Sequence, residues 1–186
     1  MKASISLIAV IAAMPALAQQ ARQLDAHEHG VGALDIAIEG NTVAMAFHAP
    51  GADIVGFEYR AESDAELAAI DAAVAMLNAP LDLFVMPDAA ACTVTKAQAE
   101  LESEHDYAEE DHDDHAENEH ANQGGHNEFH AEYTFTCDDP EALTKITFAY
   151  FETFSNAQEV QVQMIKYSGA EAFMVERDAP VLVLGR

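Results

Sequence analysis

The chain has 186 residues, half of them apolar, and its 33 acidic and 8 basic side chains give a formal net charge of −25 at pH 7. This length suits one domain with a substantial core and is short for two. So strong a negative charge excludes nucleic acid and anionic membrane surfaces as natural partners, and it favours cations.

The first residues have the pattern of a cleavable signal peptide. Lys2 supplies a positive start, residues 5–14 form a short apolar run, and Ala16-Leu17-Ala18 fits the small-x-small cleavage pattern. The apolar run is shorter than the roughly 20 residues of a spanning helix. We therefore expect cleavage after Ala18, no membrane insertion afterwards, and a mature domain of residues 19–186 in the bacterial periplasm.

Period-two alternation of apolar and polar residues predicts strands at residues 34–38 and 43–47. Gly40-Asn41 lies between them and is a two-residue turn signal, so the two strands should form a hairpin. This pairing would place the end of the second strand, at His48, opposite residue 33.

One helix has a well-defined predicted start. Ser63 and Glu66 have the spacing of a capping box, and apolar side chains then recur every three or four residues. The pattern stops at Pro80. We predict a helix at residues 64–78 whose many alanines suit close packing against a sheet.

Further strand patterns occur on both sides of an acidic stretch. They cover residues 83–86, 92–95, 130–137, 145–151, 160–167, 172–176 and 181–184. Ser168-Gly169 should turn a second hairpin, and Asp139-Pro140-Glu141 should form a turn or a single helical turn. The expected fold is α+β and rich in β-structure, with antiparallel sheets and one main helix.

The acidic stretch contains a histidine-rich tract, defined here as residues 104–130, EHDYAEEDHDDHAENEHANQGGHNEFH. It holds six of the nine histidines and no Lys or Arg. With few aliphatic side chains and so much like charge, residues 99–128 should be unable to order themselves without a ligand. We predict a disordered insertion within the domain.

Cys92 and Cys137 flank this tract. In an oxidising compartment a pair of cysteines favours a disulfide, with free buried thiols or thiolate metal ligands as alternatives. The disulfide would contribute roughly 4 kcal/mol in the chain-entropy treatment. We expect it to clamp the two ends of the insertion.

Imidazoles among carboxylates suit a borderline divalent metal, because the ring supplies a donor nitrogen and the carboxylate a second ligand or a hydrogen bond. The candidates in the tract are His105, His112, His115, His120, His126 and His130. Their spacings follow no fixed frame, so we expect several weak sites. The pairs 112/115 and 126/130 could each share a helix face if metal induced one. The alternative is a solvated linker.

A second group of candidates belongs to the folded body. His27 and His29 point to the same side of an extended chain, and Gly30 allows a close backbone approach. His48 lies on the face opposite the apolar residues of its strand, and the hairpin could bring it near that pair. Further neighbours would be Asp53, Glu58 and Tyr59. The alternatives are a polar tail and a solvent-facing strand end.

Imidazole in this number favours Zn²⁺, Cu²⁺ or Ni²⁺ over Ca²⁺ or Mg²⁺. No nucleophile elbow, H-E-x-x-H or phosphate-binding glycine loop occurs, so we do not expect an enzyme. An acidic module that binds a basic protein partner and ignores metal is the alternative from another class.

The ordered set of motifs resembles the family of zinc-regulated, histidine-rich periplasmic proteins of Gram-negative bacteria. The matching features are His27-Glu28-His29-Gly30 before a strand, residues 54–58 (IVGFE), a helix ending before Pro80, Ala91-Cys92, the tract, Cys137, and residues 151–154 and 160–163. The resemblance implies a protein that binds Zn²⁺ and buffers or delivers it, beside an ABC-type zinc importer. At Tyr59 the chain departs from the family pattern, in which histidine often follows Gly-Phe-Glu.

Overall fold

The structure is a computed structural model that describes residues 28–103 and 126–184. The predicted signal peptide, residues 1–18, lies outside the described residues. So do His27 and four histidines of the tract, namely His105, His112, His115 and His120.

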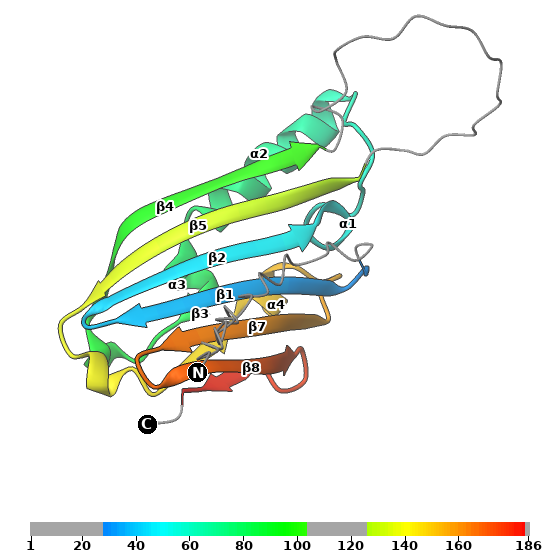
Figure 1. Cartoon of the computed structure of the whole chain (residues 1–186). Helices are drawn as coiled ribbons and strands as arrows, with labels where there is room; N and C mark the ends of the chain where they lie inside the picture. Colours follow the sequence, from blue (N-terminus) through cyan, green and yellow to red (C-terminus); the bar gives the residue numbers. More distant parts are fainter. Residues whose placement is uncertain (1–27, 104–125, 185–186) are drawn as a thin grey trace, which may run out of the picture.

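Six strands form the larger sheet, in the order β4-β5-β2-β1-β7-β8 (Figure 1). Their bounds are β1 Val31–Glu39, β2 Thr42–Pro50, β4 Cys92–Ser103, β5 Asn127–Cys137, β7 Glu159–Lys166 and β8 Gly169–Glu176. β1 and β7 pair in parallel, whereas all other neighbours in this sheet are antiparallel. The predicted hairpins β1–β2 and β7–β8 are confirmed, and Ala33 lies opposite His48 as expected.

A second layer covers one face of this sheet. It contains a small sheet, β3-β6-β9, the long helix α2 and several shorter helical segments (Figure 1). The strands are β3 Phe84–Val85, β6 Lys145–Phe148 and β9 Val181–Val183; the helical elements are α1 Gly51–Ile54, α2 Asp64–Leu77, α3 Pro80–Leu83, η1 Asp88–Ala90, η3 Pro140–Ala142 and α4 Tyr150–Thr153. Among the described residues, no helix is long and apolar enough to cross a bilayer.

The core lies between the two layers and is rich in aromatic rings. Phe47 of β2 is fully buried, and its ring centroid lies 5.6 Å from that of Phe84 and 5.1 Å from that of Tyr150. Since side chains alternate along a strand, burying Phe47 points its neighbour His48 to the opposite face. We call that opposite face, which the second layer does not cover, the outer face of the sheet.

The predicted helix and its capping box are confirmed. Ser63 Oγ accepts from the Glu66 amide at 3.2 Å, and the Glu66 carboxylate accepts from the Ser63 amide at 2.9 Å. The strand predicted at residues 145–151 ends at Phe148 instead. Tyr150 and Phe151 are both buried, and a turn of helix permits two consecutive buried residues where an alternating strand would not.

The structure narrows the predicted insertion at both ends. Residues 99–103 complete β4 and residues 127–128 begin β5, with Ser103 opposite Asn127. The acids of this segment did not prevent strand formation, because alternation places Glu100 and Glu102 on the outer face and turns Leu101 toward the core. Residues 104–125 lie outside the described part of the chain.

Cys92 and Cys137 form a disulfide, as predicted, between directly opposed residues of β4 and β5. Its predicted position at the base of the insertion is wrong. The disulfide joins the start of β4 to the end of β5, whereas residues 104–125 connect the other ends of these strands. The bond therefore closes the far end of the β4–β5 pair.

Candidate metal sites

His48, Glu128 and His130 meet on the outer face of the larger sheet, and we call them the sheet-face cluster. The register of β2 and β5 places His48 directly opposite His130, with ring centroids 4.3 Å apart. Glu128 precedes His130 by two residues on β5, so both side chains point to the same face. One ligand atom from each of the three lies within 4.8 Å of the other two.

Carboxylates surround the imidazole of His130. Its Nε2 lies 2.8 Å from Glu128 Oε2 and 3.5 Å from Glu102 Oε2, while Glu100 lies opposite it on β4. The hydrogen bond to Glu128 raises the pKa of His130; burial opposes this, and the charges of Glu128, Glu102 and Glu100 reinforce it. The surroundings of this imidazole therefore favour positive charge, which a proton or a metal ion can supply.

The spacing of the ligand atoms is close to what zinc requires. Zinc lies about 2.0–2.1 Å from nitrogen and oxygen ligands, so tetrahedral ligand atoms are roughly 3.3 Å apart. Glu128 Oε2 is 2.8 Å from His130 Nε2 and 3.9 Å from His48 Nδ1, distances that bracket this value. A hollow of about 180 Å³ lined by both histidines gives an ion room. Three protein ligands would leave a fourth position open.

A second group lies where the chain enters β1 and β5, and we call His29, Glu58 and His126 the edge cluster. Glu58 Oε2 is 2.8 Å from His126 Nδ1 and 3.4 Å from His29 Nε2. The side chain of Glu58 is only 11% exposed, whereas the two imidazoles are more than half exposed. Asn127 fixes the segment that carries Glu58. Its backbone amide donates to the Glu58 carbonyl at 3.2 Å, and its side-chain Nδ2 donates to the Tyr59 carbonyl at 2.9 Å.

Gly30 fixes the backbone beside His29. Its amide donates to Asp53 Oδ1 at 2.7 Å, and its carbonyl accepts from the amides of Gln158 and Glu159 at 2.8 and 2.9 Å. Its φ of +88° favours glycine, and a Cβ there would lie 3.3 Å from Gln158 Cγ. Gly30 therefore packs closely against the start of β7, at a position where a side chain would be strained.

The structure places in different clusters histidines that the sequence patterns grouped together. His48 contacts His130 and Glu128, whereas His29 contacts Glu58. His126 and His130 share no helix face: His130 lies within β5, His126 immediately precedes it, and each contributes to a different cluster. Tyr59 contributes to neither, because its hydroxyl donates to Glu66 Oε1 at 2.8 Å and its ring stacks on Phe57.

Sequence patterns did not identify the carboxylates in and around the sheet-face cluster. Glu128, Glu100 and Glu102 belong to a segment so rich in acids that composition cannot rank one above another. The signal that could have found Glu128 is its place two residues before His130, with apolar Phe129 between them, which is the alternation of a half-buried strand.

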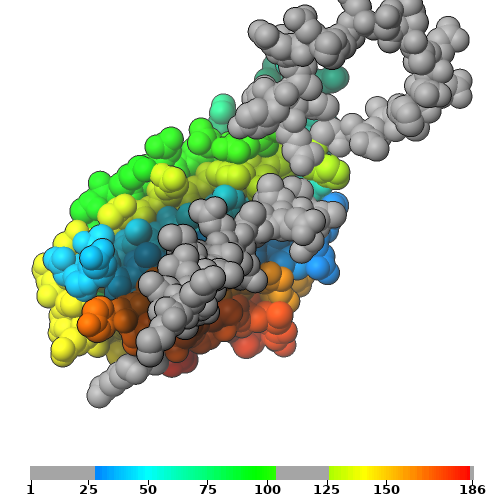
Figure 2. All heavy atoms as spheres, viewed as in Figure 1, coloured from blue at the N-terminus to red at the C-terminus, as the bar shows by residue number. Residues whose placement is uncertain are grey.

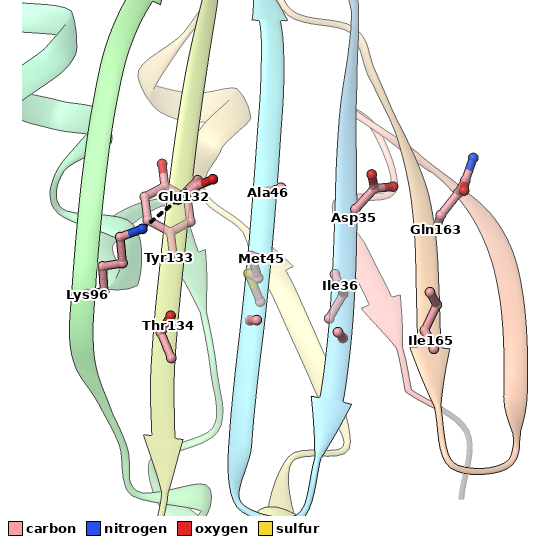
Figure 3. Close-up of a pocket in the computed structure, with 12 residues that line it drawn as sticks. Asp35, Ile36, Met45, Ala46, Lys96, Glu132, Tyr133, Thr134, Gln163 and Ile165 are labelled. Carbon is pink, nitrogen blue, oxygen red and sulfur yellow. Dashed lines mark hydrogen bonds and ion pairs between the residues drawn. The ribbon is translucent and has the colours of Figure 1, made fainter. Parts of the chain in front are cut away.

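A larger hollow of about 420 Å³ lies over the middle of the outer face (Figure 3). The residues that line it include the small side chains Ala37, Ala44 and Ala46. The ion pair of Lys96 with Glu132 lies at its rim. No histidine or cysteine is among these lining residues, so the hollow lacks the ligands of a borderline metal. In the space-filling view β4 and β5 form adjacent green and yellow bands on this face (Figure 2).

Comparison with known proteins agrees with the resemblance drawn from the sequence. The model of the ZrgA family zinc uptake protein matches residues 26–184. No curated protein matches the chain. The family match includes both histidine clusters, the tract and the disulfide, and it extends over most of the chain. The chain belongs to the ZrgA family of zinc uptake proteins.

Proposed function

We propose that this protein captures Zn²⁺ in the periplasm and holds it for uptake, with His48, Glu128 and His130 as ligands. The observation that carries the proposal is the convergence of these three side chains on the outer face, with ligand atoms within 4.8 Å of one another. Membership of a zinc uptake family supports zinc over Cu²⁺ and Ni²⁺, which the same ligands would also accept.

The charge and the geometry of the protein suit reversible capture. The strongly acidic chain attracts cations from solution. Two imidazole nitrogens and one carboxylate oxygen would then replace part of the hydration shell of zinc, and Glu102 and Glu100 would offset its charge. Because the side chains of His48 and His130 remain 34% and 25% exposed, a competing ligand can reach the open coordination position and take the ion away.

The cellular setting is part of the same proposal. The disulfide suits an oxidising compartment, and the signal-like N-terminus predicts export to the periplasm. Delivery to a periplasmic component of an ABC zinc importer would give the captured zinc a destination. We propose binding and release without bond chemistry, in keeping with a family of uptake rather than catalysis.

A zinc titration on a two-histidine variant tests the proposed ligands. In this full-length variant the seven histidines other than His48 and His130 are replaced by Asn, and zinc affinity is measured by competition with a chromophoric chelator. We expect His48→Ala and His130→Ala each to weaken binding about tenfold or more, since even outer-shell changes around a metal cost 10–100-fold.

Glu132→Gln is the matched control. Glu132 lies on the same strand and face as Glu128, but its partner is Lys96. Glu132 also lines the hollow beside the cluster, but it is not among the three proposed ligands. Its substitution should therefore reduce zinc affinity much less than Glu128→Gln. Equal affinity for the two-histidine variant and for its His48→Ala and His130→Ala derivatives would contradict the proposed ligands.

A further inference from the structure

Two carboxylates in or beside the edge cluster, those of Asp53 and Glu58, each have a buried oxygen without a donor among the described residues. Asp53 is 2% exposed, and its Oδ1 accepts the Gly30 amide, yet its Oδ2 accepts no hydrogen bond from any described residue. Oε1 of Glu58 is likewise buried without a donor among the described residues. Buried polar atoms normally have partners, so each of these oxygens can still take a proton, a water molecule or an ion.

The two acids are close enough to affect one another. Burial raises the pKa of Asp53; the Gly30 hydrogen bond and the charge of His29 lower it, and the charge of Glu58 raises it again. Two carboxylates in one partly buried region repel each other, which makes positive charge favourable there. Protonated imidazoles would neutralise Glu58 Oε2, but they would leave the second oxygen of each acid without a donor.

The two imidazoles are placed to supply the remaining ligands of a cation. His29 Nε2 and His126 Nδ1 both contact the same oxygen, Glu58 Oε2. Among the described residues, ligand atoms that all lie within 4.8 Å of one another occur at the sheet-face cluster and not at the edge cluster, so a cation here would have to draw the two imidazoles together. Both rings are more than half exposed, which leaves them room to rotate. The backbone beneath them is fixed by the hydrogen bonds of Gly30 and Asn127.

We infer that His29, Glu58 and His126 form a second divalent-cation site, which takes Zn²⁺ through two nitrogens and one or both oxygens of Glu58. Asp53 would support this site from behind, by fixing Gly30 and adding negative charge. His126 and His130 are four residues apart, about 13 Å along an extended strand, so one ion cannot occupy both clusters. The choice of zinc rests on the proposed function, but the ligands do not depend on the sheet-face cluster.

Native mass spectrometry with Zn²⁺ tests this inference on the full-length chain. The background variant has His27, His105, His112, His115 and His120 replaced by Asn, which leaves the four histidines of the two clusters. We expect two zinc ions per chain. His29→Ala with His126→Ala should leave one, His48→Ala with His130→Ala should leave one, and all four substitutions together should leave none.

Two carboxylate substitutions serve as a matched pair. Glu58→Gln should reduce the count from two to one, whereas Glu62→Gln, at an exposed acid of the same loop, should leave it at two. Thermal melting of each variant shows whether it folds. As a second readout, zinc should shift the ring ¹⁵N resonances of His29 and His126 in the background variant, without any substitution at the cluster itself.

The outcomes separate the two sites. If the background variant binds one ion and loses it only when His48 and His130 are changed, the edge cluster is an ion-pair network and the inference is overturned. If changing His48 and His130 has no effect while changing His29 and His126 removes an ion, the proposed sheet-face ligands fail and the edge site stands. Unmoved ¹⁵N resonances at His29 and His126 would also overturn the inference.

Discussion

At the scale of single residues, His130 has the most charged surroundings of the sheet-face cluster. It contacts Glu128 and Glu102 directly and lies opposite Glu100, so three carboxylates from two strands favour its protonated form. The same carboxylates would favour a bound metal ion. A proton and zinc therefore compete for one nitrogen, which makes pH the natural variable at this residue.

The raised pKa of His130 predicts that, as pH is lowered, zinc affinity at the sheet-face cluster begins to fall while the pH is still above about 6.5, the ordinary value for histidine. In the metal-free protein the sign is opposite. The stability from protonated His130 is fully present below about pH 6.5 and is lost as pH rises through the raised pKa. Zinc titrations at several pH values and an NMR titration of His130 measure the two effects.

Glu102→Gln sharpens this test because it removes one of the three charges while leaving the ligands in place. The pKa of His130 should decrease in this variant, and the loss of zinc affinity should begin at a lower pH. A pKa of His130 at or below 6.5 in the unsubstituted protein, or one unaffected by Glu102→Gln, would show that the carboxylates do not act as described.

At the scale of elements, β5 connects the two clusters. Its residues Glu128 and His130 belong to the sheet-face cluster, and His126, immediately before it, belongs to the edge cluster. Its register with β2 brings His48 to His130, and its pairing with β4 brings Glu102 to the same place. A shift of β5 by one residue in its pairing would turn Glu128 and His130 toward the core.

The effect of a deletion in the tract on zinc binding therefore depends on which residues are removed. Replacing residues 104–125 with Asn-Gly should leave β4 and β5 paired, since Ser103 lies opposite Asn127 and the new Asn-Gly with His126 makes a three-residue hairpin loop between them. This variant should retain two zinc ions by native mass spectrometry. Replacing residues 99–128 instead removes Glu102, His126 and Glu128, so binding at both clusters should be lost.

Thermal melting should show a cooperative transition for the shorter deletion, which serves as its folding control. If the folded 104–125 deletion binds no zinc, residues 104–125 hold the metal and the two clusters of the folded body do not.

Local sequence patterns predicted the elements that depend on neighbours in the chain. The alternation of Leu34 and Ile36, the turn at Gly40-Asn41 and the capping box at Ser63 each correspond to an observed element. The parallel pairing of β1 with β7 left no such pattern, because it joins segments more than 100 residues apart. The partners of His48 were missed for the same reason.

At the scale of the whole molecule, the disulfide and the histidine clusters lie toward opposite ends of the β4–β5 pair. Cys137 ends β5, and His130 lies seven residues before it, about 23 Å away at the usual rise of a strand. Cys92 and Cys137 flank the tract in the sequence. In the structure they lie at the other end of the strand pair, because β4 extends as far as Ser103. The acidic composition of the last residues of β4 hid this extension.

Removing the disulfide should therefore weaken the fold without affecting the metal. We predict that Cys92→Ser with Cys137→Ser lowers the free energy of unfolding by about 2–4 kcal/mol in denaturant titrations. Zinc affinity of the folded protein should change by no more than about twofold, since well-separated sites couple by only about 0.3–0.5 kcal/mol. A large loss of affinity in the folded variant would show that the far end of the hairpin positions the ligands.

Anomalous diffraction across the zinc absorption edge, on crystals of the full-length protein grown with Zn²⁺, tests whether the sheet-face cluster binds zinc. We expect an anomalous peak between the imidazoles of His48 and His130 and the carboxylate of Glu128. Peaks elsewhere on the molecule with none at this cluster would contradict it.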